Sequence, residues 1–169
     1  MRKSFLSSFF LPVLAAVVLA GCSPTYNWRD YNSPDAPYQA MFPDKPVTHT
    51  RSVNLDGMTV NMTMAAANID GTVFAIGSGE APDAAQAQKA VTSMKTALVK
   101  NIGATITREE TNNSALKIDA KGVQNGTPMR LVGHFESRGT RFYQVIVMGK
   151  ATDMPQDQVD MFMSSFKLH

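Results

Sequence analysis

The chain of 169 residues contains a single cysteine, Cys22, and few of the motifs that identify enzymes. One cysteine cannot form an internal disulfide, so the fold must depend on its hydrophobic core. No Gly-x-Ser-x-Gly elbow, phosphate loop or dinucleotide fingerprint is present. These absences exclude a disulfide scaffold and leave no recognisable catalytic constellation. We therefore expect no enzymatic activity and no cofactor.

Histidine is also scarce, with only His49, His134 and His169. None lies within four residues of another histidine or of Cys22, so no zinc site follows from local spacing. His134 alternates with Val132 and Glu136 along an expected strand, where a site assembled across a sheet is still conceivable. A solvent-facing histidine, or one bonded to a neighbouring residue, is the more common situation.

The N-terminus has the anatomy of a secretory signal, with basic Arg2 and Lys3 followed by an apolar segment from Phe5 to Ala20. The segment ends in Leu19-Ala20-Gly21-Cys22, which resembles the lipobox of bacterial lipoproteins. The resemblance implies cleavage between Gly21 and Cys22 and lipidation of Cys22. Ser23, where aspartate often signals inner-membrane retention, resembles the outer-membrane default. An ordinary secretory peptide with a stray thiol is the alternative.

Excess charge of either sign is missing once the signal is removed. The net charge of +2 comes from Arg2 and Lys3, and the remaining chain carries 14 basic and 14 acidic residues. A balanced surface argues against nucleic-acid binding, which needs concentrated positive charge. It also argues against a polybasic attachment to anionic lipids. The expected membrane contact is therefore the lipid itself.

Cleavage after residue 21 leaves 148 residues, enough for one self-sufficient domain. We expect a lipidated tether over 22–37, rich in proline and turn formers, and a single globular domain over 38–169. A tether of this length spans at most about 50 Å at ~3.3 Å per residue. Its aromatic residues Tyr26, Trp28 and Tyr31 either attach it to the domain or lie at the lipid headgroups.

Within the domain, alternating patterns and turn dipeptides predict strands, and one long amphipathic stripe predicts a helix over 84–102. Asp83 and Gln86 form a capping-box arrangement at its start, and Gly103 terminates it. Asp153 and Pro155 mark the start of a second, short helix with an apolar stripe formed by Val159, Phe162, Met163 and Phe166. The expected strands are 38–42, 47–55, 58–64, 72–78, 104–109, 115–121, 129–136 and 141–148. This order predicts an α+β fold with a mostly antiparallel sheet.

Met58, Met62 and Met64 alternate with polar residues along one predicted strand. Thioether sulfurs are soft metal donors, so a shared metal site is one interpretation. No histidine or cysteine accompanies them in the pattern, and methionine commonly fills irregular cores. Core packing is the favoured interpretation.

The opening Tyr38-x-x-x-Phe42-Pro43-x-x-Pro46, the long capped helix between two sheet halves, and the closing run Met161 to Phe166 occur in one order. This arrangement resembles the PsbP-like α/β/α sandwich family over most of residues 38–168. The family includes photosystem accessory proteins and bacterial envelope lipoproteins. The resemblance implies a non-catalytic accessory role and assigns no catalytic residue.

The sequence therefore favours an outer-membrane lipoprotein facing the periplasm, whose domain binds another envelope protein. The alternative is a lipoprotein that binds a small ligand or a metal in a cleft between the sheet and the long helix, near His134 and the methionines. A bound metal or deep polar pocket would favour the ligand hypothesis, and a shallow apolar patch would favour the partner hypothesis.

Overall fold

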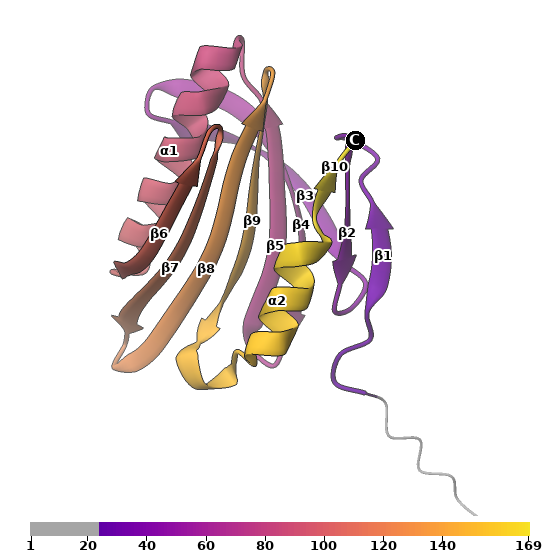
Figure 1. The fold of residues 1–169 in the computed structure, drawn as a ribbon, viewed down its shortest axis with the longest axis vertical. Coiled ribbons are helices and arrows are strands. Elements are labelled where there is room, and N and C mark those ends of the chain that lie inside the picture. Colours follow the sequence, from indigo (N-terminus) through magenta and orange to yellow (C-terminus); the bar gives the residue numbers. More distant parts are fainter. Residues whose placement is uncertain (1–23) are drawn as a thin grey trace, which may run out of the picture.

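The computed structural model describes residues 24–169, so the expected signal peptide, the Leu19–Cys22 motif and the lipidation site lie outside the described residues. Ten strands, two α-helices and one short 3-10 helix build the described chain (Figure 1). The strands are β1 (Arg29–Asn32), β2 (Tyr38–Phe42), β3 (Val47–Leu55), β4 (Met58–Ile69), β5 (Thr72–Glu80), β6 (Thr105–Asn112), β7 (Ala115–Gln124), β8 (Thr127–Arg138), β9 (Arg141–Lys150) and β10 (Lys167–Leu168). The helices are α1 (Ala84–Asn101), η1 (Ala151–Asp153) and α2 (Gln156–Ser165).

A seven-stranded antiparallel sheet in the order β3-β4-β5-β9-β8-β7-β6 dominates the structure. Its tight turns follow the chemistry of their sequences. Asp56-Gly57, Asp70-Gly71 and Asn125-Gly126 all have positive φ angles, which asparagine, aspartate and glycine adopt most readily. β9 lies at the centre, as its nearly continuous apolar sequence predicts. The expectation of an α+β fold with a mostly antiparallel sheet is confirmed.

Helix α1 covers one face of this sheet and begins as predicted. The Asp83 carboxylate accepts the backbone N–H of Gln86 at 2.8 Å and its side-chain amide at 2.9 Å. Gly103 follows the helix with a φ of +57°, the left-handed conformation that ends helices. Ala87, Ala90, Val91 and Met94 are buried against the sheet, where they join Phe135, Phe142 and Ile146.

The other face of the sheet is covered by α2 together with a small sheet in the order β1-β2-β10 (Figure 1). Its core combines Phe74 of β5, Tyr143 of β9 and Phe42 of β2 with Phe162 of α2. Phe162 meets Phe42 and Phe74 edge to face, with ring centroids 5.2 and 5.4 Å apart. The large sheet therefore separates two hydrophobic cores, one on each face.

The segment expected to be a tether over 22–37 is folded wherever the structure describes it. Residues 29–32 form β1, and the backbone N–H of Asn27 donates to the Pro43 carbonyl at 2.8 Å. Tyr26 and Trp28 are stacked on each other, and both meet Phe74 edge to face. Of the two interpretations of the aromatic residues, attachment to the domain is the one observed, because these rings gain more by covering the core than by remaining in water.

Smaller differences concern element ends. The expected polar loop 110–114 is shortened to a turn at Asn113-Ser114, because β6 continues through Asn112 in pairing with β7. Strand pairing there overrides the polar sequence. Asp153 is the last residue of η1, and Pro155 occupies the N-cap position directly before α2.

Candidate functional site

An open groove of about 630 Å³ lies between the outer half of the large sheet and the C-terminal elements. Helix α2 packs on β2 and β9, and the adjoining surface of β7 and β8 forms the other side of the groove. The groove is lined by Lys117, Ile118, Val132, Gly133, His134, Glu136, Arg138, Asp160, Met163, Ser164, Phe166 and Leu168. Most of these side chains are half-buried or exposed, so the depression is a groove rather than an enclosed cavity.

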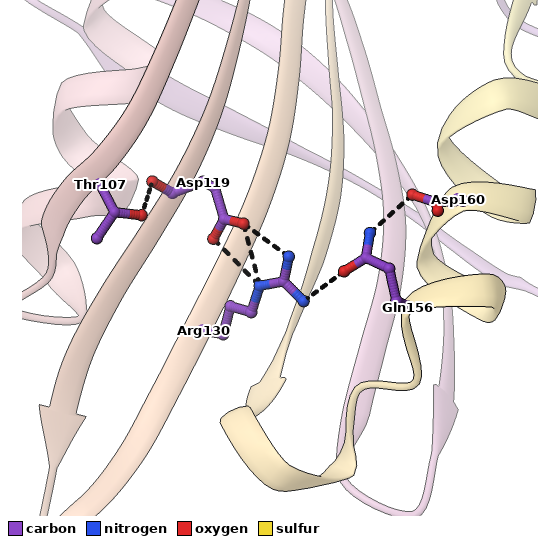
Figure 2. A network of polar contacts seen from close by, with 5 residues as sticks. All are labelled: Thr107, Asp119, Arg130, Gln156 and Asp160. Atoms are coloured by element: carbon purple, nitrogen blue, oxygen red, sulfur yellow. Dashed lines mark hydrogen bonds and ion pairs between the residues drawn. The ribbon is translucent and has the colours of Figure 1, made fainter.

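A polar network joins β7, β8 and α2 (Figure 2) and includes Asp160, which lines the groove. The Arg130 guanidinium binds both carboxylate oxygens of Asp119, at 2.6 to 3.2 Å, and donates to the Gln156 side-chain oxygen at 2.9 Å. Gln156 in turn donates to Asp160 at 2.8 Å. The hydrogen bonds with Asp119 raise the pKa of Arg130. Because planar two-point pairing with a carboxylate is specific to arginine, this network fixes where α2 begins over the sheet.

The middle of the groove contains His134, which alternates with Val132 and Glu136 on β8 as the sequence predicts. Its Nε2 lies 2.9 Å from a Glu136 carboxylate oxygen, and its ring contacts the Phe166 ring at a centroid distance of 6.0 Å. His134 is therefore bonded to a neighbouring residue, which is the more common of the two situations considered from the sequence. Lys117 pairs with His134 across the strands and extends an exposed cation into the groove.

Met58, Met62 and Met64 lie on the opposite face of the sheet, in the core beneath α1. Met64 accepts a hydrogen bond from the Gln144 amide, at 3.4 Å to Sδ. The expected cleft that would combine His134 with the methionines is wrong, because strand alternation places them on opposite faces. Within residues 24–169, no group of three or more histidine, cysteine, aspartate or glutamate side chains is placed to hold a metal ion.

The groove combines an apolar wall on α2 and β10 with polar groups on β7 and β8. It can bind a mixed apolar and polar segment or molecule, since a few oriented polar groups in an apolar surround are typical of binding sites. Sequence reasoning missed Arg130, Asp160 and the α2 wall as parts of one site. The available signal was the alternation of charged residues along β8, which indicates that one face of the strand is accessible. It does not indicate which element lies beside that face.

Comparison with known proteins adds little. No family model and no curated protein matches the chain. Among solved structures, the crystal structure of the protein of unknown function PA94 from Pseudomonas aeruginosa is similar at 12% identity, with a TM-score of 0.36. The alignment covers 78% of this chain and 89% of that one. A likeness at this level carries no functional argument.

Proposed function

We propose that this protein is a lipid-anchored module of the bacterial envelope that binds a partner protein and has no catalytic activity of its own. The lipobox-like Leu19-Ala20-Gly21-Cys22 supports the anchor. The observation that carries the proposal further is the hydrogen bond from the Asn27 backbone to Pro43, which attaches the chain to the domain five residues after Cys22.

This attachment limits how far the domain can move from the membrane. Five residue steps between Cys22 and Asn27 span at most about 17 Å at ~3.3 Å per residue. The long tether expected from composition would allow three times that distance. A domain held so closely suits an accessory role beside another envelope protein. No helix within residues 24–169 combines the length and hydropathy that a bilayer span requires.

The polar residues of the groove favour binding over catalysis. The polar side chains that could act in catalysis are bonded to one another, as in His134 with Glu136 and Arg130 with Asp119. These contacts stabilise the groove and do not present an activated nucleophile. The order of elements also supports the PsbP-like architecture, which we infer from the Tyr38 to Pro46 opening and the long helix between two sheet halves.

A second candidate function is binding of a small molecule in the same groove. Its volume of about 630 Å³ supports this candidate, because ligand sites commonly occupy roughly 300–1,000 Å³. The apolar part of such a ligand would contact Leu168, Met163 and Phe166. An acidic group of the ligand would contact Lys117. A screen of the purified protein by thermal shift would detect it, with Val132→Asp as the variant expected to abolish binding.

Expression of the full gene beside a Cys22→Ala variant tests the anchor. We expect the wild-type protein to carry the mass of the acyl groups and to sediment with outer membranes, because several chains bind far more strongly than one. The variant should have an unmodified mass and a soluble distribution. An unacylated wild-type protein in the soluble periplasmic fraction would refute the lipoprotein assignment.

A further inference from the structure

The large sheet has two edge strands, β3 and β6, and each leaves a row of backbone N–H and C=O groups without a strand partner in the described chain. Such edges can pair with other polypeptides. Natural proteins therefore protect them with charged side chains, prolines, bulges or short strands. The two edges of this sheet differ sharply in this respect.

Strand β6 has several protective features. Its register with β7 shifts between Ile106 and Arg108, the sign of a bulge that twists the edge. Arg108, Glu109 and Glu110 place three charges in succession on a strand of eight residues. Glu109 also receives the Lys95 ammonium of α1 at 2.8 Å. This edge is closed to pairing.

Strand β3 lacks nearly all of these features. All nine of its residues pair with β4 in one uninterrupted register. Its sequence VTHTRSVNL contains no proline and no acidic residue, and Arg51 is its only permanently charged side chain. Seven of its nine positions are exposed. A long, uninterrupted and accessible edge of this kind is a template for an added strand.

The hairpin between β3 and β4 determines which backbone groups point outward. The two-residue turn Asp56-Gly57 makes its flanking pair, Leu55 and Met58, a hydrogen-bonded pair. Pairs of this kind alternate along an antiparallel ladder. The outward N–H and C=O groups therefore belong to Thr48, Thr50, Ser52 and Asn54.

Two side-chain features accompany this edge. Val47 is 75% exposed and borders a hollow of about 410 Å³, which is lined by the apolar residues Ala66, Ala67 and Val73 and by the polar residues Asp44, Lys45 and Asn68. Four residues further along the same side of β3, Arg51 forms no ion pair within residues 24–169. A partly apolar hollow and an unmatched cation thus lie four residues apart beside the outward backbone groups.

We propose that β3 accepts an extended segment of another envelope protein as an additional strand of the large sheet. This inference rests on the proposed protein-binding function and names its contact surface. Backbone hydrogen bonds would supply affinity, and side chains on alternate positions would supply specificity. In antiparallel pairing, the segment has an acidic residue opposite Arg51 and, four residues later, an apolar residue in the hollow at Val47.

A second copy of this chain is a poorer occupant. Self-pairing over the full length of β3 centres on Arg51 and places two guanidinium groups opposite each other. Like charges directly opposite in a sheet are destabilising. Complementary charge therefore points to an acidic segment from a different protein.

The test measures binding of a fluorescent nonapeptide to the full mature lipoprotein in detergent. The peptide alternates threonine and valine but has glutamate at its fifth position and leucine at its ninth. Ser52→Pro removes an outward N–H that β4 does not use, a substitution that edge strands tolerate. We expect at least about a tenfold loss of affinity, because a ring replaces a backbone donor at the centre of the new pairing. Thr111→Pro, the matched position on β6, should bind the peptide as the wild type does.

Arg51→Glu provides a second variant that retains the backbone. It should bind the glutamate peptide about tenfold more weakly, and a peptide with lysine in place of glutamate more strongly. This variant keeps the proposal testable if circular dichroism shows that Ser52→Pro is unfolded. Equal binding to wild type, Ser52→Pro and Arg51→Glu would overturn the proposal. A dimer of the lipoprotein that Ser52→Pro converts to monomers would overturn it too, in favour of a second copy. Binding in detergent does not need an acylated Cys22, so failure of the anchor and failure of the β3 contact are distinguishable.

Discussion

At the scale of single residues, polar side chains determine where the helices of this protein are placed. Asp83 satisfies backbone donors at the start of α1, and Arg130 connects the sheet to the first turn of α2 through Gln156. Helix ends leave backbone groups without partners inside the helix, so a few side chains there have large structural effects. The groove depends on this placement because α2 forms one of its sides.

The Asp83 cap makes part of the stability dependent on pH. Hydrogen bonds from the side chain and backbone of Gln86 lower the pKa of Asp83 below its ordinary value of 3.8. A lowered pKa in the folded state means that the contribution is complete above that value and is lost as the pH falls through the lower folded pKa. We expect Asp83→Ala to reduce the melting temperature by a few degrees at pH 7.

The melting temperatures of wild type and Asp83→Ala should approach each other as the pH falls below 3.8 and through the lower pKa of the folded carboxyl, because protonation removes the charged acceptor. Asp83→Asn, which retains a capping oxygen without charge, should lie between the two at pH 7 and should not share the pH dependence of wild type. A difference between wild type and Asp83→Ala that is constant from pH 7 to pH 2 would contradict this account.

At the scale of elements, the alternation of side chains along each strand distributes residues between two cores. Even-numbered positions of β4 from Met58 to Met64 contact the α1 side, and His134 of β8 points to the α2 side. The two faces differ in coverage, since α1 packs on both β8 and β9 whereas α2 packs on β9 and on β2 of the small sheet. The groove is the consequence of this unequal coverage.

Close approach of β7 to the end of α1 gives a test of this packing. A Cβ atom at Gly122 would lie 2.9 Å from both the Ala104 Cα and the Ile102 carbonyl oxygen. These are backbone atoms that cannot rotate away, so Gly122→Ala should force the end of α1 from the sheet. We expect a loss of about 1–3 kcal/mol in the free energy of unfolding, measured with urea.

Lys121→Ala is the matched control, because Lys121 is exposed and its side chain has no hydrogen bond or ion pair within residues 24–169. It should change the free energy of unfolding by less than about 0.5 kcal/mol. Equal stability of Gly122→Ala and Lys121→Ala would show that α1 and β7 are less tightly packed than the structure indicates.

At the scale of the whole molecule, few residues separate Cys22, the proposed lipid attachment point, from the folded body. Trp28 is the only tryptophan, and it packs on the core six residues after Cys22. Its Nε1 donates to the Gln158 side chain of α2 at 3.0 Å, so the start of the described chain is joined to its C-terminal helix. The first described residues therefore set the position of the entire domain if Cys22 is acylated.

Energy transfer from Trp28 to an acceptor on lipid headgroups measures this distance. Six residue steps reach at most about 20 Å, so we expect efficient transfer in vesicles that contain the acylated protein. Insertion of fifteen glycine and serine residues after Ser23 should reduce the transfer clearly and leave the melting temperature unchanged. Equal transfer in both proteins would refute close positioning of the domain.

Much of this architecture could be read from the sequence because the determinants are local. Period-two patterns, turn dipeptides such as Asn125-Gly126 and the Asp83 cap act over a few residues, so they predicted strands β2 to β9, the hairpins and α1, but not β1 or β10. The motif that ends in Cys22 likewise predicts export and lipidation, and that prediction awaits its experiment.

Contacts between distant segments were decided only by the tertiary structure. Nothing local indicates that Trp28 covers Phe74, that Asp119 binds Arg130 beside α2, or that His134 and Met62 occupy opposite faces. Local composition favoured a tether around Trp28, but burial of aromatic area outweighed it. The order of strands in the sheet also decided which of them became edges. By itself the sequence determined the elements and their exposed or buried faces, and long-range packing determined the groove and the accessible β3 edge, because both depend on which elements are neighbours.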